Sequence, residues 1–220
     1  MPHDLPACRP ALPFVTIVSG LPRSGTSLMM QMLRAGGMSV VCDEQRQADL
    51  NNPQGYFESA CLPGFFAGPV PFQSLQGRAV KVVFPLVLQI PENCPVRILF
   101  MQRDLAEILL SQRNMLHRLG LPGALVSDTQ MAAYWARELK TGLRKLEQRS
   151  HISFLELTFR EVLNEPRRAA EMVCQFLTAE LDQGQMASIV DASLYRSQIS
   201  AQESVLIHAK TKNGGHPPVV

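Results

Sequence analysis

The sequence predicts a single α/β domain in which helices cover both faces of a central parallel sheet. Short segments rich in β-branched residues alternate along the chain with helical segments of ten residues or more, an order typical of such sheets. The 220 residues, 46% of them hydrophobic, are enough for one full core. We expect the domain to span residues 14–197, between a flexible N-terminus (1–13) and a weakly ordered C-terminal tail (198–220).

Four strands are predicted from short apolar runs at residues 14–18, 78–84, 96–101 and 151–157. Four helices are predicted from apolar residues at helical spacing, at residues 26–35, at about 104–119, in a long segment beginning at the capping sequence "SDTQ" (127–130), and at 166–177. On the long helix, Tyr134 and Trp135 are expected in the core. Residues 42–76 are rich in Pro, Gly, Asn and aromatic residues, which favours a long ordered loop acting as a lid.

The composition argues against several classes of protein. A net charge of +2 is too small to indicate nonspecific binding to nucleic acid or to a membrane surface. No apolar run reaches the roughly 18–20 residues of a membrane span, and the first residues do not resemble a signal peptide. The five cysteines are scattered without a C-x-x-C pair, which predicts reduced thiols and a cytoplasmic location. The five histidines are equally scattered, so we expect no metal site.

The segment "SGLPRSGTSLMM" (19–30) follows the first predicted strand and nearly matches G-x-x-x-x-G-K-[ST], the phosphate loop of nucleotide triphosphatases. Both glycines and the final serine are in register, but Thr26 replaces the lysine, and Arg23 lies inside the loop. A strand, a glycine turn and a helix direct backbone N–H groups and the positive end of the helix dipole to one point, which suits a phosphate or sulfate group. Arg23 supplies the positive charge that the missing lysine would give.

A second anion site is predicted where the third strand runs into Gln102-Arg103-Asp104. In a nucleotide triphosphatase, the neighbouring strand ends in an aspartate that helps to hold Mg²⁺. Here an arginine precedes the aspartate, which suits a second anion better than a metal. Anion sites at two strand ends describe a nucleotide with phosphates at both ends of its ribose.

These two segments resemble the motifs of a known family. "GLPRSGTSLMMQML" resembles the 5′-phosphosulfate loop of the sulfotransferases that use 3′-phosphoadenosine-5′-phosphosulfate, and "FMQRDLAEILLSQ" resembles their 3′-phosphate motif. "ISFLELTFREVLNEPRRAAEMVCQFL" resembles a later segment, and "CDEQRQADLNNPQGYFE" one of bacterial-type members, so the resemblance covers about residues 14–180. It implies the P-loop-like sulfotransferase fold. It also implies in-line, metal-independent transfer of a sulfuryl group from this adenine nucleotide donor to a hydroxyl or amine of an unknown acceptor.

The resemblance also implies which residues bind the donor. The 5′-phosphosulfate would be bound by the loop residues Pro22, Arg23, Ser24, Gly25, Thr26 and Ser27. Arg103 and Ser111 keep the spacing of the family's 3′-phosphate motif; without it, Ser111 would be interpreted as an ordinary exposed helix serine. The late Arg-Lys-Gly segment of cytosolic animal members is absent, so either the 3′-phosphate is bound more loosely or another residue, such as Arg113, substitutes.

Candidates for the chemistry at the acceptor are a carboxylate base and a second cation beside Arg23. Glu44 and Glu58 are the two candidate bases, with Asp49 between them a weaker third, although each could instead be solvated or hold the loop in place. Lys81, on the second predicted strand, is the candidate cation. A lysine at the edge of the sheet that reaches solvent is the alternative.

Two other functions stay open from the sequence. A nucleotide kinase or triphosphatase with a degenerate phosphate loop would require Mg²⁺, and the missing lysine argues against it. An inactive module that binds an adenine nucleotide would keep the donor site without the acceptor chemistry.

Overall fold

The computed structural model of the chain describes residues 12–42, 57, 71–92, 94–123 and 125–191. A five-stranded sheet, with strand order β2-β3-β1-β4-β5, forms its centre. The strands are β1 (Val15–Gly20), β2 (Ser39–Val41), β3 (Arg78–Lys81), β4 (Val96–Gln102) and β5 (Ile152–Thr158). Every neighbouring pair is parallel, so all the carboxyl ends lie at one edge of the sheet. The predicted fold class is confirmed.

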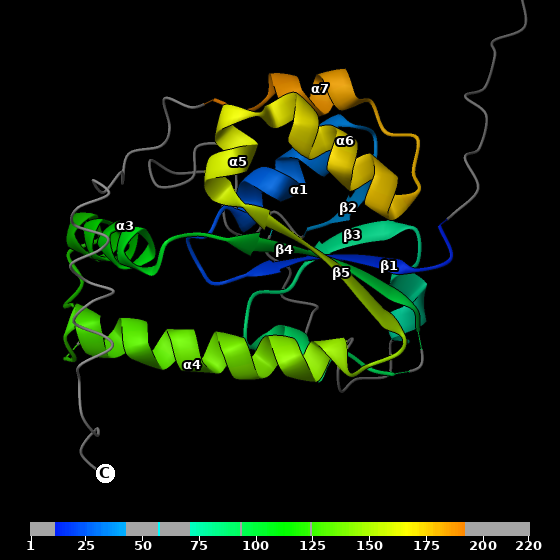
Figure 1. Cartoon of the computed structure of the whole chain (residues 1–220). Coiled ribbons are helices and arrows are strands. Elements are labelled where there is room, and N and C mark those ends of the chain that lie inside the picture. The colour runs from blue at the N-terminus through cyan, green and yellow to red at the C-terminus, as the bar shows by residue number, and fades with distance from the viewer. Residues whose placement is uncertain (1–11, 43–56, 58–70, 93, 124, 192–220) are drawn as a thin grey trace, which may run out of the picture.

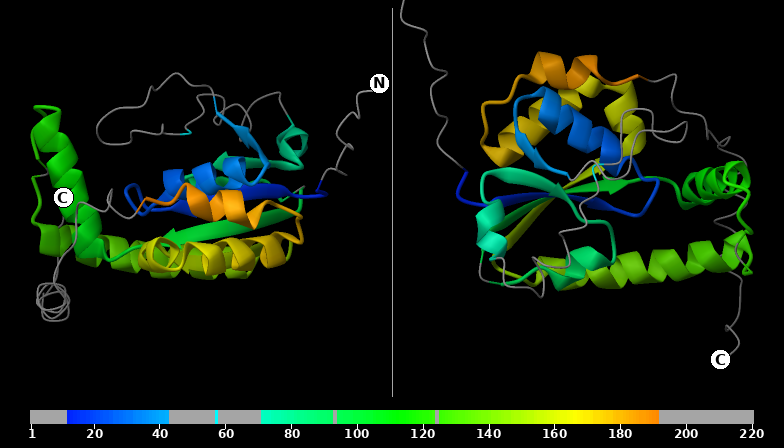
Figure 2. Two further views of the ribbon diagram at one scale, coloured as in Figure 1. Left: turned by 90° about the horizontal axis from the view of Figure 1, so that it is seen from above. Right: turned by 180° about the vertical axis from the view of Figure 1, so that it is seen from behind.

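Helices lie on both faces and across one end of this sheet (Figure 1). They are α1 (Thr26–Ala35), α3 (Leu105–Arg118), α4 (Asp128–Glu147), α5 (Phe159–Asn164), α6 (Pro166–Leu177) and α7 (Gln183–Ser188). Helices α1, α5, α6 and α7 cover one face, and α4 runs along the other. Figure 2 shows α3 lying across the end of the sheet where the chain leaves β4, next to the start of α4. Short 3-10 turns span Phe72–Leu75 and Leu86–Gln89.

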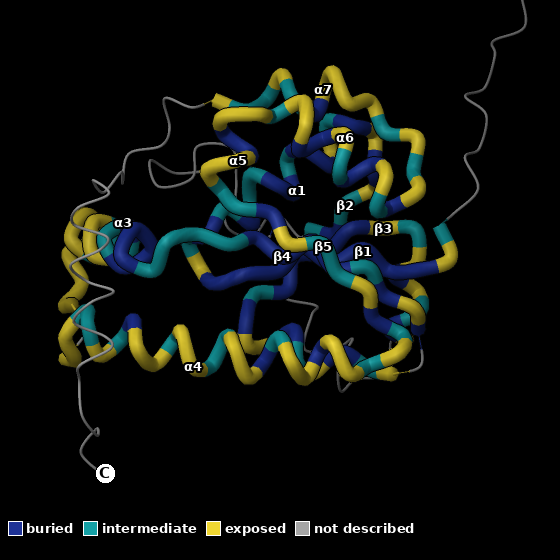
Figure 3. The backbone as a smooth tube through the Cα atoms, viewed as in Figure 1, coloured by how far each residue is buried: buried dark blue, intermediate teal, exposed yellow. Residues whose placement is uncertain are grey.

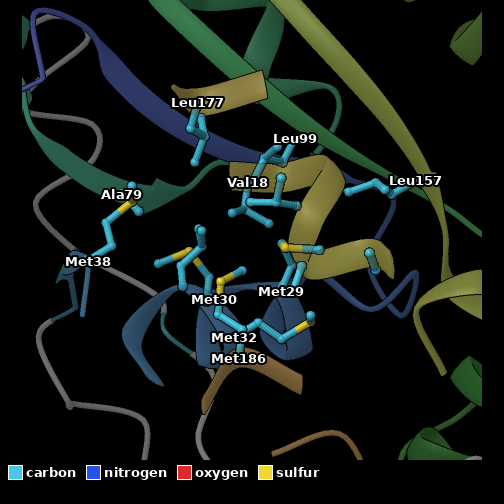
Figure 4. Packing of buried hydrophobic residues seen from close by; sticks show 14 of the residues in the cluster. Val18, Met29, Met30, Met32, Met38, Ala79, Leu99, Leu157, Leu177 and Met186 are labelled. Atoms are coloured by element: carbon cyan, nitrogen blue, oxygen red, sulfur yellow. The ribbon is translucent and has the colours of Figure 1, made fainter. Parts of the chain in front are cut away.

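The sheet separates two hydrophobic clusters. One face packs against α1, α6 and α7 through a cluster rich in methionine. Figure 4 shows Met29, Met30, Met32, Met38 and Met186 of this cluster, which also contains Met101. The other face packs against α3 and α4 through branched and aromatic residues such as Ile17, Ile98 and Phe100. All six residues of β1 are buried, because β1 is the middle strand and is covered on both faces. Figure 3 shows this buried centre and the exposed outer sides of α4, α6 and α7.

The structure differs from the sequence predictions in a few elements. The strand predicted at 78–84 ends at Lys81, although the Val82 and Phe84 N–H groups still donate to carbonyl groups of the β1 strand. The short elements β2, α5 and α7 were not predicted. Their three, six and six residues are too few for a periodic pattern to stand out.

The expectation that Tyr134 and Trp135 lie in the core is half wrong. Trp135 packs against the cluster on the α3 and α4 face of the sheet, and it contacts the Phe84 ring edge-on with a centroid distance of 6.3 Å. Tyr134 is 47% exposed. Adjacent residues of a helix are 100° apart around its axis, so both cannot face the sheet.

Candidate functional site

The loop between β1 and α1 has a backbone that only glycine fits at two positions. Gly20 (φ 141°) and Gly25 (φ 101°) lie in the region that L-residues rarely adopt. A Cβ on Gly20 would lie 2.4 Å from the Met101 carbonyl oxygen, and one on Gly25 would lie 2.4 Å from the Phe159 ring. The loop therefore packs tightly against the end of β4 and the start of α5. Arg23 also has a positive φ of 73°, which is unusual for a residue other than glycine.

The first turn of α1 carries the features of an anion site. Gly25 is its N-cap and gives no side-chain hydrogen bond, whereas Asp104 and Ser127 cap the two longer helices α3 and α4. The N–H groups that begin α1 thus lack a side-chain cap and are oriented toward the loop. Within the part of the chain that the structure describes, the Ser24 hydroxyl is buried without a hydrogen-bond partner. A buried, unpaired hydroxyl beside an uncapped helix start fits a bound oxyanion that accepts from both.

The segment predicted to bind the 3′-phosphate lies next to this loop. Arg103 follows β4, and Ser111 lies two turns into α3, where it is buried rather than exposed. The Arg23 Nε donates to the Ser111 Oγ over 3.0 Å, and an Arg103 Nη1 donates to the Arg23 carbonyl oxygen over 3.0 Å. Residues 80 and 88 positions apart in the sequence are thereby joined at the carboxyl edge of the sheet.

A buried carboxylate that the sequence analysis did not single out completes this group. Glu107, in the first turn of α3, is 3% exposed. One of its oxygens accepts from Arg103 Nε and the other from Arg160 Nη2 of α5, each over 3.1 Å. The Arg103 guanidinium also lies over the Phe159 ring, 4.7 Å from its centroid. The sequence offers little signal for this pair, because Arg103 precedes the N-cap Asp104 and so lies outside the helix that carries Glu107.

No family model and no curated protein matches the chain by sequence. Solved structures do resemble it. Mouse sulfotransferase SULT7A1, complexed with PAP, is 11% identical, with a TM-score of 0.53 over 87% of this chain and 69% of that one. Sulfotransferase STF9 from Mycobacterium avium is 14% identical, with a TM-score of 0.50 over 91% of this chain and 76% of that one. The chain has the sulfotransferase fold. A sulfotransferase domain from the curacin biosynthetic pathway is 17% identical, with a TM-score of 0.48 over 92% of this chain and 99% of that one.

Within this sulfotransferase fold, Lys81 lies at the carboxyl end of β3, beside the loop strand. It pairs in register with Val18, so its side chain leaves the sheet on the α1 face. Lys81 is 6% exposed and β3 lies between β2 and β1. The alternative of an edge lysine that reaches solvent is therefore wrong.

The other predicted residues are distributed as follows. Thr26 is buried, Ser27 is half-buried, and Pro22 is exposed on the outside of the loop. Arg113, the suggested substitute for the late segment, is 58% exposed and forms an ion pair with Asp128 at the start of α4. The candidate bases Glu44 and Glu58, and the weaker candidate Asp49, lie outside the described residues.

Asp104, the residue next to Arg103, serves as a helix cap. Asp104, the residue that would hold Mg²⁺ in a triphosphatase, caps α3 and accepts from the Ala106 and Glu107 N–H groups. Among residues whose placement is described, no three His, Cys, Asp or Glu side chains gather as a metal site would require. Burial raises the pKa of the Cys94 and Cys174 thiols, so both are protonated near neutral pH. Over the same part of the chain, no helix is both long and apolar enough to cross a bilayer.

Proposed function

We propose that the chain is a sulfotransferase that moves a sulfuryl group from 3′-phosphoadenosine-5′-phosphosulfate to a hydroxyl or amine of an acceptor. The observation that carries the proposal is the pair of hydrogen bonds that joins Arg23 to Ser111 and Arg103 to Arg23. Two segments that are predicted to bind anions, and that are widely separated in the sequence, are joined by these bonds at the carboxyl edge of the sheet. Ligands of open α/β sheets bind at this edge. We place this function in the α/β domain of residues 14–197, and we keep the prediction of a cytoplasmic location.

The residues of the loop fit the phosphosulfate end of the donor. The uncapped start of α1 and the Ser24 hydroxyl would donate to its oxygens, with Thr26 and Ser27 adding further hydroxyl groups. Arg23 would stabilise the negative charge that develops on the leaving phosphate. Arg103 and Ser111 would bind the 3′-phosphate, which distinguishes this donor from ATP.

The transfer itself needs no metal in this proposal. The acceptor oxygen or nitrogen forms a bond to sulfur while the bond from sulfur to the 5′-phosphate oxygen breaks, and adenosine 3′,5′-bisphosphate leaves. The acceptor proton passes to a carboxylate, for which Glu44 and Glu58 remain the candidates. Lys81, buried at the end of β3 next to the loop strand, would be the second cation near the moving group.

A fold shared with sulfotransferases also accommodates the alternatives. A degenerate kinase or triphosphatase would need Mg²⁺ and a γ-phosphate, and Asp104 is engaged as the cap of α3. A module that binds the nucleotide without catalysis would use the same donor site. Both are treated as outcomes of the following test.

The test is a calorimetric titration of the whole chain with adenosine 3′,5′-bisphosphate, with AMP, and with ATP plus Mg²⁺. We expect the bisphosphate to bind without metal and more tightly than AMP. Binding of ATP alone, and only with Mg²⁺, would favour the kinase. If the bisphosphate binds, transfer of radioactive sulfate from the donor to a panel of phenols, alcohols and amines tests catalysis. If the bisphosphate binds but no sulfate is transferred to any acceptor of the panel, the binding module would be favoured.

A further inference from the structure

Glu107 is a buried carboxylate, and its burial destabilises the fold unless its charge is compensated. It is 3% exposed, and burial of a charge disfavours folding unless ion pairs and hydrogen bonds compensate. Both of its oxygens are engaged, one by Arg103 and one by Arg160. Arg160 belongs to α5 and is itself 63% exposed, so the carboxylate joins α3 to the start of α5 from the inside.

The contact with Glu107 is one of three that hold the Arg103 guanidinium in place. The Nε of Arg103 donates to Glu107, its Nη1 donates to the Arg23 carbonyl, and its planar group lies over Phe159. A planar guanidinium that is held at two nitrogens and one face has a single orientation. The carbonyl that it holds belongs to the loop residue with φ 73°, a conformation that needs outside support in a residue other than glycine.

We infer that Glu107 is a positioning residue: it orients Arg103, and Arg103 in turn braces the Arg23 backbone, so that the 5′ and 3′ anion sites form as one unit before the nucleotide binds. This inference rests on the proposed function for the identity of the ligand, but the brace itself does not depend on it. Glu107 binds Arg103, and Arg103 binds the Arg23 carbonyl group. Glu107 thus acts through Arg103.

A negative charge next to a phosphate site would by itself weaken anion binding. Two variants separate this charge effect from positioning. Glu107→Asp keeps the charge and shortens the reach, whereas Glu107→Gln keeps the reach and removes the charge. Glu138→Asp is the matched control, because Glu138 also lies in a helix and pairs with an arginine, Arg137, on exposed α4.

The first measurement is the dissociation constant of adenosine 3′,5′-bisphosphate and of AMP, by calorimetry on the full chain. We expect Glu107→Asp to weaken the bisphosphate about tenfold and AMP by about threefold, since one oriented charge-assisted contact is lost and the loop loosens. In an Arg103→Met background, Glu107→Asp should change neither constant by more than about twofold, because coupled residues lose their effect together. Glu138→Asp should match the wild type for both ligands, and melting temperatures show how far each variant is destabilised overall.

The second measurement needs no nucleotide. Trypsin cleaves after Arg23 at the very carbonyl that Arg103 holds, so the cleavage rate reports release of the brace. We expect Glu107→Asp and Arg103→Met each to raise this rate about fivefold or more, relative to cleavage after Lys140 in α4, which monitors general loosening. Arg103→Met removes the brace directly, so the result does not depend on one variant of Glu107.

The outcomes are distinct. Unchanged cleavage after Arg23 in both variants overturns the brace. A Glu107→Asp protein that binds the bisphosphate like the wild type, with Glu107→Gln binding more tightly, reduces Glu107 to a charge effect and overturns the positioning role. Equal losses from Glu107→Asp with and without Arg103 also overturn it. A wild-type chain that does not bind the bisphosphate at all overturns the proposed function, while the cleavage rates still decide the brace.

Discussion

Arg23 is the predicted substitute for the charge of the phosphate-loop lysine, but it lies at a different position. The lysine of a nucleotide triphosphatase extends from the start of the helix, whereas Arg23 lies inside the loop, with a left-handed backbone and its Nε on Ser111. Its carbonyl is held by Arg103. One loop residue thus contacts both residues of the predicted 3′-phosphate site. A change at the 3′ site should therefore be felt at the 5′ site, but more weakly.

Replacing Arg103 with alanine tests that order of effects. A charge-assisted contact with phosphate contributes about 1.5–3 kcal/mol, so Arg103→Ala should weaken adenosine 3′,5′-bisphosphate by roughly 10- to 100-fold. The loss for AMP should be much smaller, because AMP has no 3′-phosphate. Calorimetry with both ligands gives the comparison, and Arg137→Ala on exposed α4 is the control. Equal losses for the two ligands would remove Arg103 from the 3′ site.

Gly25 offers a second test at the scale of one residue. In Gly25→Ala, the new methyl group would meet the Phe159 ring at 2.4 Å and would hold an L-residue at φ 101°. The left-handed backbone alone costs about 1–2 kcal/mol, so we expect the free energy of unfolding to fall by about 2 kcal/mol or more. Urea denaturation measures it. Gly123→Ala is the control, since nothing lies within 4 Å of the added methyl group and its loss should stay within about 0.5 kcal/mol.

Among the elements, the short helix α5 is stabilised by the capping box at its N-terminus. It has six residues, and it begins directly where β5 ends, at Thr158. The Thr158 hydroxyl accepts from the Glu161 N–H, and the Glu161 carboxylate accepts from the Thr158 N–H and hydroxyl. This capping box orients the next two residues, Phe159 and Arg160, toward Arg103 and Glu107.

Thr158→Ala should lower the free energy of unfolding by about 1 kcal/mol at pH 7. Hydrogen bonds from Thr158 lower the pKa of Glu161 below its ordinary value of 4.5. A carboxyl whose pKa is lower in the folded state contributes stability above pH 4.5, and loses it as the pH falls through the folded value. The difference between Thr158→Ala and wild type should therefore narrow from pH 7 to pH 4, as measured by urea denaturation at both. Ser127→Ala is the control.

Ser127→Ala removes a capping box of the same kind, but the side chain that completes this box has no titratable group. Ser127 of α4 pairs with Gln130, so the loss from Ser127→Ala should be similar at pH 7 and pH 4. A Thr158→Ala deficit that stays constant with pH would contradict the role assigned to the Glu161 charge.

The elements also show how far the sequence alone can lead. Helices 26–35 and 166–177 have the predicted bounds, because Gly36 and Pro166 are strong local signals. The start of α5 has no such signal, because Thr158 is both the last residue of β5 and the N-cap of α5. The residues of the loop and of the 3′ motif could be named from the sequence, and their roles stay predictions. The role of Arg160 could not be predicted, because its contact with Glu107 spans 53 positions and depends on where the chain places α5 after β5.

The whole molecule gathers its candidate site from elements on both sides of the sheet. The loop follows the middle strand β1, Arg103 follows β4, and Lys81 ends β3, while α1 and α3 pack on opposite clusters. A ligand held at this edge would contact residues anchored in both hydrophobic clusters. Its binding should therefore stabilise the domain as one cooperative unit, not the loop alone.

Thermal unfolding tests this at the scale of the whole molecule. A ligand at 100 times its dissociation constant adds about 2.7 kcal/mol to the folded state, which for a domain of this size raises Tm by roughly 5–10 °C. We expect adenosine 3′,5′-bisphosphate to give such a shift with a single transition, unchanged by EDTA. Arg103→Ala at the same ligand concentration should show a clearly smaller shift, because that concentration is then only about 1 to 10 times the weakened dissociation constant, which adds about 0.4–1.4 kcal/mol. A shift that appears only with ATP and Mg²⁺ would instead indicate a metal-dependent triphosphate site, and the arginine at the end of β4 would have to serve another ligand.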